Sequence, residues 1–210
     1  MDTLLGMDQF FPPQDALRHQ IAMSAAKMIA EEGYDYPSAR LKAIKQSGAS
    51  KKIKREQQPS DQEIENEVRA YQSLYQSDTQ PGELRAMRQE ALELMQQIQE
   101  FEPIVFGPVV NGTGNKMSDI QLVAFSDDPK EIDYWLLNKD IAFDACEDAL
   151  LAGKTFNAVG FKWRQYWVQL GSATPRDRRG LLKNSQRAGV PFQTDTSGLI
   201  KLINETHNQT

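Results

Sequence analysis

Apolar residues recur at helical spacing through the first part of the chain. Across residues 14–32 they fall every three or four positions, which predicts a helix that ends at Gly33. A shorter segment with the same spacing, residues 38–46, predicts a second helix with Leu41 and Ile44 facing inward. We therefore expect a helical N-terminal region.

Two longer amphipathic segments follow. Ser60 and Glu63 form a capping box, in which each side chain bonds the backbone N–H of the other residue, and this predicts the start of a helix. The apolar positions of that helix are Ile64, Val68, Tyr71 and Tyr75. After a turn near Pro81, residues 84–101 carry the most regular helical stripe of the sequence, and we expect it to pack against the next segment.

Strand patterns follow this stripe. Two short apolar runs, Ile104–Phe106 and Ile120–Phe125, have the length and the β-branched or aromatic content of buried strands. Residues 142–146 predict another short strand, and residues 149–151 predict a helical turn. The aromatic stretch at residues 156–170 predicts a hairpin whose second strand completes the sheet.

Three further segments complete the pattern. The Asp-Asp-Pro sequence at residues 127–129 predicts the start of a helix that runs to Asn138. Residues 174–184 are polar and rich in arginine, which indicates either an exposed surface loop or a contact for phosphates. A short helix is expected near residues 199–203. Together these elements predict an α+β fold, with a helical N-terminal region in residues 1–80 and a small mixed sheet flanked by helices in residues 81–210.

The small number of cysteine and histidine residues excludes several kinds of site. Cys146 is the single cysteine, so intramolecular disulfides and cysteine metal sites are impossible. Only His19 and His207 are available for a zinc site or a histidine-based triad. The sequence has no apolar run of about 18 residues that would cross a membrane and no signal-peptide pattern, so we expect a cytoplasmic protein with no membrane partner.

The net charge of −5 argues against a dedicated nucleic-acid binder. Residues 37–55 depart from this balance, because they contain seven Lys or Arg residues and no acid. They are either a contact strip for phosphates or a solvated helix face and loop. No aromatic residue interleaves the charges as a stacking platform would require, which favours the solvated face.

The connection between the first two strands carries the candidate chemistry. Gly107, Gly112 and Gly114 make it flexible, and Asp119 stands at the head of the second strand. A glycine-containing turn can offer backbone N–H groups to an anion, and an aspartate beside it can hold a hard cation. This arrangement suits a phosphate and a metal ion.

Two stretches of this connection have a recognisable order, Gly107-Pro108-Val109-Val110-Asn111-Gly112-Thr113 and Ser118-Asp119-Ile120-Gln121-Leu122. Together they resemble the signature of the nucleotidyltransferase superfamily, of the DNA polymerase beta type. That signature is a Gly-Ser pair, a small turn with a second glycine, and then Ser-Asp-hydrophobic-Asp-hydrophobic on the next strand. The resemblance covers about twenty of the 210 residues.

The resemblance implies a fold, a cofactor and a set of site residues. Asp119 corresponds to the first catalytic aspartate, and Asp119 and Gln121 occupy the two positions that hold Mg²⁺ in the family. The residues implied to face the triphosphate are Gly107, Asn111, Gly112, Thr113 and Ser118. Residues i and i+2 of a strand point to the same side, which is why two such ligands reach one metal cluster.

Three departures from the family pattern bear on activity. Pro108 replaces the serine of the turn and lacks both the hydroxyl and the N–H of that residue. Gln121 replaces the second aspartate, and the strand expected to carry the third carboxylate, within residues 165–170, has none. Asp144 and Glu147 are the acidic residues that could substitute if the strand order differs from the expected one.

Two functions are consistent with these residues. The first is a nucleotidyltransferase that moves a nucleoside monophosphate from a nucleoside triphosphate to an unknown acceptor, by the two-metal route. The second is a catalytically degenerate module of the same fold that binds a nucleotide or a partner protein. The missing carboxylates favour the second, and the turn with Asp119 keeps the first open.

Overall fold

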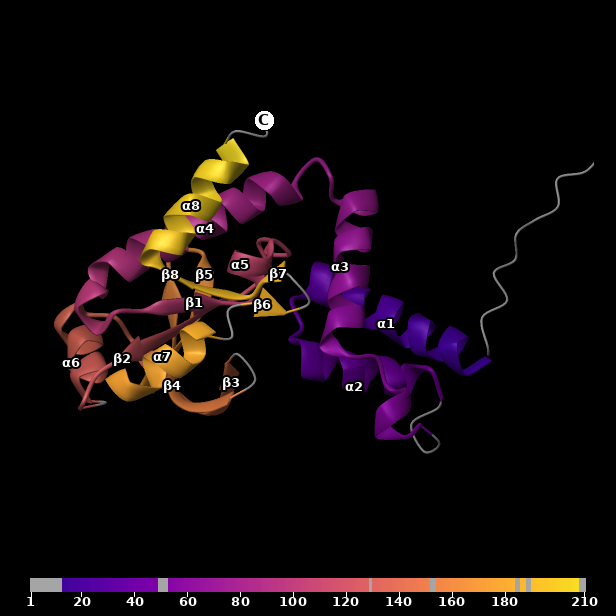
Figure 1. The fold of residues 1–210 in the computed structure, drawn as a ribbon, viewed down its shortest axis with the longest axis horizontal. Helices are drawn as coiled ribbons and strands as arrows, with labels where there is room; N and C mark the ends of the chain where they lie inside the picture. Colours follow the sequence, from indigo (N-terminus) through magenta and orange to yellow (C-terminus); the bar gives the residue numbers. More distant parts are fainter. Residues whose placement is uncertain are drawn as a thin grey trace, which may run out of the picture.

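The computed structural model describes residues 13–48, 53–128, 130–151, 154–183, 186–187 and 190–207. It shows a mixed α+β protein in which N-terminal helices precede an open sheet with helices on both faces (Figure 1). The sheet has six strands in the order β3-β4-β5-β2-β1-β8. Its strands are β1 (Ile104–Phe106), β2 (Ile120–Phe125), β3 (Phe143–Leu151), β4 (Lys154–Trp163), β5 (Tyr166–Ala173) and β8 (Gln193–Asp195). A separate two-stranded ribbon consists of β6 (Gln186–Arg187) and β7 (Val190–Pro191).

The two strands expected around the glycine-containing connection are neighbours. Strand β1 pairs antiparallel with β2, and β2 pairs parallel with β5, so the sheet is mixed. The predicted aromatic hairpin is β4 and β5, which pair antiparallel. These findings confirm the adjacent strands and the hairpin that the hydrophobic pattern predicts.

The N-terminal helices are α1 (Pro13–Glu32), α2 (Tyr36–Gln46) and α3 (Asp61–Tyr75), with a short 3-10 helix at Arg55–Gln57 before α3. They share a hydrophobic core of their own, which includes Ile21, Ala25, Ile44, Ile64 and Val68. Leu41 was expected in this core but is 55% exposed, so that prediction is wrong. The alanines Ala39 and Ala43 face inward with Ile44 instead, because small side chains let α2 approach α1 closely.

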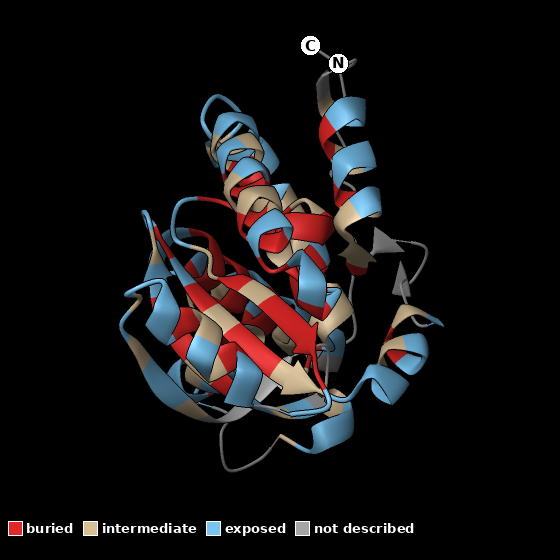
Figure 2. Cartoon of the chain, turned by 90° about the vertical axis from the view of Figure 1, so that its left-hand side faces the viewer, coloured by how far each residue is buried: buried red, intermediate tan, exposed pale blue. Residues whose placement is uncertain are grey.

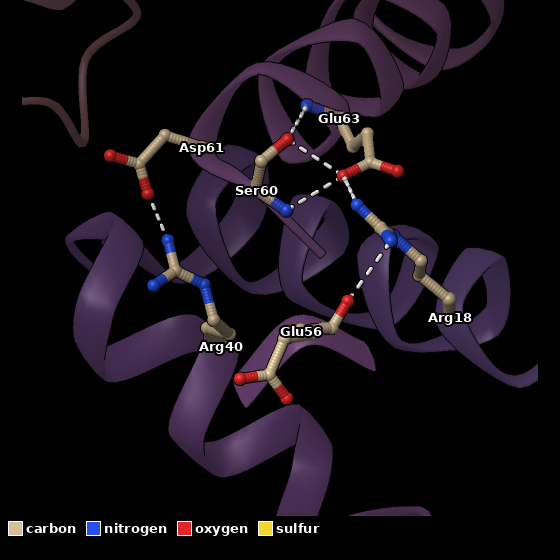
Figure 3. Close-up of polar contacts among 6 residues, drawn as sticks. All are labelled: Arg18, Arg40, Glu56, Ser60, Asp61 and Glu63. Carbon is tan, nitrogen blue, oxygen red and sulfur yellow. Dashed lines mark hydrogen bonds and ion pairs between the residues drawn. The ribbon is translucent and has the colours of Figure 1, made fainter. Parts of the chain in front are cut away.

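Polar contacts connect the three helices at the start of α3 (Figure 3). The predicted capping box is present: Glu63 N donates to Ser60 Oγ, and Ser60 N donates to Glu63 Oε2 at 2.8 Å. Arg18 of α1 donates to the same Oε2 at 2.6 Å, and Arg40 of α2 pairs with Asp61. Burial opposes ionisation of Glu63, but the hydrogen bonds from Arg18 and Ser60 lower the pKa of its carboxyl group to about 2.

The long helix α4 (Gln80–Gln97) lies on one face of the sheet beside α8 (Thr196–His207), and a 3-10 helix at Gln99–Phe101 leads from α4 into β1. The predicted stripe of α4 packs against the strands, since Leu94, Ile98 and Phe101 share a core with Val105 and Leu122. Helix α6 (Lys130–Asn138) joins this face, and α7 (Pro175–Lys183) covers part of the other face. Strands β1 and β2 are therefore buried almost throughout, whereas the helices expose their outer sides (Figure 2).

Three local segments differ from what the sequence pattern indicates, for physical reasons. Residues 149–151 are strand rather than a helical turn, because β3 continues past an irregularity between Cys146 and Ala149 that interrupts its two-residue alternation. Residues 175–183 form helix α7 where a surface loop was one of the two interpretations, and Thr174 donates to Oδ2 of Asp177 at the start of this helix. The connection after β1 contains a single helical turn, α5 (Pro108–Asn111), which its glycines and proline had not predicted.

Candidate functional site

The connection from β1 to β2 begins with a sharp change of chain direction at Gly107. Its φ of 64° and ψ of −133° are readily adopted by glycine and strained for other residues. A Cβ atom at this position would also lie 3.1 Å from Oε1 of Gln121. Gly107 and Gln121 are therefore brought together, as the resemblance implies for the turn and the strand that carries the metal ligands.

The residues implied to hold metal lie on one face of the sheet, near the amino ends of β2 and β5. The two strands are parallel, with Gln121 paired to Gln169, and Asp119 immediately precedes β2. Nε2 of Gln169 donates a hydrogen bond to Oδ2 of Asp119 at 3.0 Å. Gln169 thus occupies the neighbouring-strand position where the third carboxylate of the family was expected.

The electrostatic environment of Asp119 is unusual for a carboxylate. Desolvation raises its pKa, the hydrogen bond from Gln169 opposes that rise, and the negative charge of Asp35 adds to it. The residue is half-buried, and the amide of Gln169 donates a hydrogen bond to it without contributing a positive charge. A cation bound here would relieve the cost of keeping Asp119 ionised.

These residues fit one Mg²⁺ ion better than two. Asp119 supplies a carboxylate, and the side-chain carbonyls of Gln121 and Gln169 can supply neutral oxygen atoms. Mg²⁺ commonly binds one or two carboxylates together with substrate phosphates, so a triphosphate would complete a single site. Within the described part of the chain, no three Asp, Glu, His or Cys residues cluster as metal ligands.

The two substitute carboxylates do not complete the site. Asp144 lies on β3, three strands away from β2 in the sheet order. At about 4.8 Å between strands, its backbone is roughly 14 Å from that of Gln121, which is too far to share a metal ion with Asp119. The side chain of Glu147 lies outside the described residues.

Helix α3 covers the turn that was implied to face the triphosphate. Nδ2 of Asn111 donates to Oε2 of Glu65 at 3.1 Å, and Oδ1 of Asn111 accepts from N and Oγ1 of Thr113 at 3.0 and 2.8 Å. Gln72 also donates to the carbonyl oxygen of Thr113 at 2.7 Å. Asn111 and Thr113 are both buried, so their side chains hold the turn against the N-terminal helices.

Further side chains fix the backbone of the same turn. Nε2 of Gln80 donates to the carbonyl oxygens of Gly112 and Gly114 at 3.0 and 2.9 Å. The buried Arg88 of α4 donates to the carbonyl oxygen of Val109 at 2.9 Å and reaches Thr206 of α8. These carbonyl oxygens point to protein donors, and N–H groups of the turn are paired as well. Gly107 N donates to the carbonyl oxygen of Phe192 at 3.0 Å, and Val110 N and Asn111 N donate to the carbonyl oxygen of Gly107 at 2.9 Å.

Ser118 also has a structural partner, since its hydroxyl group donates to Oδ1 of Asn115 at 3.2 Å. Asn115 is buried and donates to the carbonyl oxygen of Ala30 at the end of α1. The segment before Asp119 is therefore anchored on the N-terminal helices as well. The structure thus places Gly107 against Gln121 and Asp119 against Gln169, and it places Asn111, Thr113 and Ser118 in contacts within the protein.

Four residues of this region escaped the sequence reasoning. Glu65 and Gln72 are buried polar residues of α3, whereas Tyr75, expected on its apolar stripe, is 66% exposed. Glu65 and Gln72 are seven residues apart, which is two turns of helix, so both lie on the same side of α3. This spacing indicates that a polar side of α3 faces protein. Gln169 and Arg88 gave weaker signals, because a glutamine in a strand and an arginine in a helix are usually exposed.

A separate hollow lies at the opposite end of the sheet. It has a volume of about 490 Å³ and opens at the carboxyl ends of β2 and β5. Its lining residues are Ser126, Asp127, Thr155, Phe156, Asn157, Ser172, Ala173, Thr174, Asp177 and Leu181. None of the residues implied by the resemblance belongs to it, so the hollow and the Asp119 site are distinct.

Comparison with models of known protein families finds no match to this chain, and comparison with curated proteins finds none either. Among the described residues, no helix is long and apolar enough to span a membrane.

Proposed function

We propose that this protein is a catalytically degenerate nucleotidyltransferase-like module that binds a nucleoside triphosphate with one Mg²⁺ ion. The observation that carries the proposal is the register of β2 and β5, which sets Gln121 beside Gln169 and next to Asp119. Under the proposal these three residues would occupy the metal-ligand positions of the family, and they include one carboxylate. Binding of one metal with its nucleotide needs only that carboxylate, whereas two-metal transfer needs more charge.

The turn after β1 supports the binding half of the proposal. Gly107 directs the chain into α5 while lying against Gln121, so a phosphate at the start of the turn would be next to the metal ligands. Pro108 has no N–H, and the N–H of Gly107 already donates to the carbonyl oxygen of Phe192 at 3.0 Å. We therefore expect weaker phosphate binding than in a turn with serine, and a requirement for Mg²⁺.

Calorimetric titration with each nucleoside triphosphate, with and without Mg²⁺, tests the proposal. We expect Mg²⁺-dependent binding that Asp119→Asn abolishes and Gln121→Asp tightens. A matched control is Asp127→Asn, at the opposite end of the sheet, which should leave binding unchanged. Absence of nucleotide binding in the wild type would reject the proposal and leave a protein-interaction module as the alternative.

A transfer assay separates the degenerate module from an active enzyme. Incubation with labelled nucleoside triphosphates should give transfer far slower than about 1 s⁻¹, the lower end of common enzyme rates. Transfer at or above that rate would contradict the degenerate site and favour the nucleotidyltransferase hypothesis. Chemical analysis of the labelled product would then identify the molecule that accepts the nucleoside monophosphate.

A further inference from the structure

Trp167 is an exposed aromatic residue on the sheet face that carries the proposed site. It precedes Gln169 by two positions on β5, so both side chains point to the same side of the sheet. Ile120 of β2 pairs with Val168 of β5. Asp119 and Trp167 immediately precede these two paired residues, so they are neighbours on adjacent strands. Trp167 nevertheless remains 41% exposed.

Gly160 of β4 makes room for the indole ring. A Cβ atom at Gly160 on β4 would lie 2.6 Å from Cζ2 and 3.1 Å from Cε2 of Trp167. The ring therefore lies over the space that the side chain of residue 160 would fill, level with Gln169 in the β4–β5 register. Contact with Gly160 accounts for part of the ring, and the exposed part of Trp167 is accessible to a ligand.

Charges of both signs surround the ring, because Asp119 lies beside it and Asp144 pairs with Gly160, so binding of an anionic ligand would depend on Mg²⁺. Lys162 is the cross-strand partner of Trp167 and is exposed. Adjacent strands are about 4.8 Å apart, so the ring, the cation and Asp119 lie within the reach of one small molecule. Toward the carboxyl end of β2 the same sheet face is covered, because Val123 and Phe125 pack beneath Leu181 of α7.

We propose that Trp167 stacks on the base of the bound nucleoside triphosphate, an inference that rests on the proposed function. With the phosphates at Gly107 and the metal at Asp119, Trp167 is an exposed aromatic surface next to the metal ligand. Stacking tolerates any base, since every base has a π face. Trp167 is thereby a positioning residue for the nucleoside half of the ligand.

The test compares ATP with inorganic triphosphate, both with Mg²⁺, because inorganic triphosphate has no base. Trp167→Ala should weaken ATP binding by about 5-fold to 150-fold, the range measured for base–aromatic stacking. It should leave the affinity for inorganic triphosphate unchanged, which also shows that the variant is folded. Trp167→Phe, which keeps a ring, should retain most of the ATP affinity. Tyr134→Ala removes another exposed aromatic residue, on α6, and should change neither affinity.

The remaining outcomes overturn the inference in distinguishable ways. Equal ATP affinity in wild type and Trp167→Ala would reject stacking while leaving the proposed nucleotide site in place. Equal weakening of ATP and inorganic triphosphate would show that Trp167 supports the sheet only. Failure of the wild type to bind either ligand would reject the proposed function and this inference together.

Discussion

The side chain of Gln169 presents its amide nitrogen to Asp119, with Nε2 donating to Oδ2 at 3.0 Å. A metal ion on Asp119 would require the carbonyl oxygen of that amide instead, so the side chain would have to turn over when the ion binds. The hydrogen bond stabilises the metal-free arrangement. Replacing Gln169 with a residue that cannot donate this bond should therefore favour the metal-bound arrangement.

Gln169→Glu should create a metal-dependent protein. Two carboxylates would then face each other without the present hydrogen bond, which should lower the free energy of unfolding in chelator by about 1–3 kcal/mol. Mg²⁺ should restore much of that loss, because a ligand that binds only the folded state stabilises it. Thermal unfolding with chelator and with Mg²⁺ measures both effects. Gln89→Glu, an exposed change on α4, should show neither, and a Mg²⁺-independent Gln169→Glu variant would contradict the expectation.

Asp119→Asn should leave the metal-free protein at least as stable as the wild type near neutral pH. Burial raises the pKa of Asp119, so ionisation at neutral pH costs folding free energy that asparagine does not incur. Because the pKa of Asp119 is raised in the folded protein, any stability that Asp119 contributes is present at low pH and is lost as the pH rises through its folded pKa. Chemical unfolding at pH 4 and pH 7 checks this, and a destabilised variant at pH 7 would show that Asp119 has a structural role.

The local hydrophobic pattern predicted much of the fold, including both strands around Gly107 and the helix that leads into them. It failed where a tertiary contact overrides the local signal. Leu41 is apolar but exposed because alanines make closer helix contacts, and residues 149–151 are strand because they pair with β4. Neither fact is encoded in a short window of sequence.

The candidate site was predictable only in part for a similar reason. The order of Gly107, Asp119 and Gln121 along the chain indicated the turn and the strand. The partnership of Gln121 with Gln169 depends on strand register, and that of Asn111 with Glu65 depends on how α3 docks. Such pairings of residues distant in sequence need the three-dimensional fold.

Asn111→Ala should loosen the turn from the N-terminal helices. The change removes a hydrogen bond to Glu65 and two bonds from Thr113, and it leaves these buried groups with fewer partners. We expect a loss of about 2–3 kcal/mol in the free energy of unfolding, because unsatisfied buried polar groups retain their desolvation cost. Asn138→Ala, at the exposed end of α6, should change stability by about 0.5 kcal/mol or less. Similar unfolding midpoints for the two variants would contradict a structural role of Asn111.

Glu63, at the junction of α1 and α3, should contribute to the way in which the stability of the protein changes with pH. Its pKa falls from 4.5 to about 2 in the folded protein, chiefly through hydrogen bonds from Arg18 and Ser60 that outweigh the opposing effect of burial. A depressed pKa stabilises the fold above the unfolded value, and that stabilisation is lost as the pH falls from 4.5 toward 2. Because the side chain of Glu63 is 41% exposed, solvent screening limits the contribution to about 1 kcal/mol or less.

Glu63→Gln tests this assignment in a series of unfolding measurements. The variant should be less stable than the wild type at pH 7, and the difference should shrink as the pH is lowered toward 2, where the wild-type carboxylate becomes protonated. High salt should reduce the difference at pH 7, because it screens the ion pair with Arg18. Gln62→Glu places a charge one residue away and should not reproduce the effect. A stability difference that is the same at pH 2 and pH 7 would mean that Glu63 acts through packing rather than through its charge.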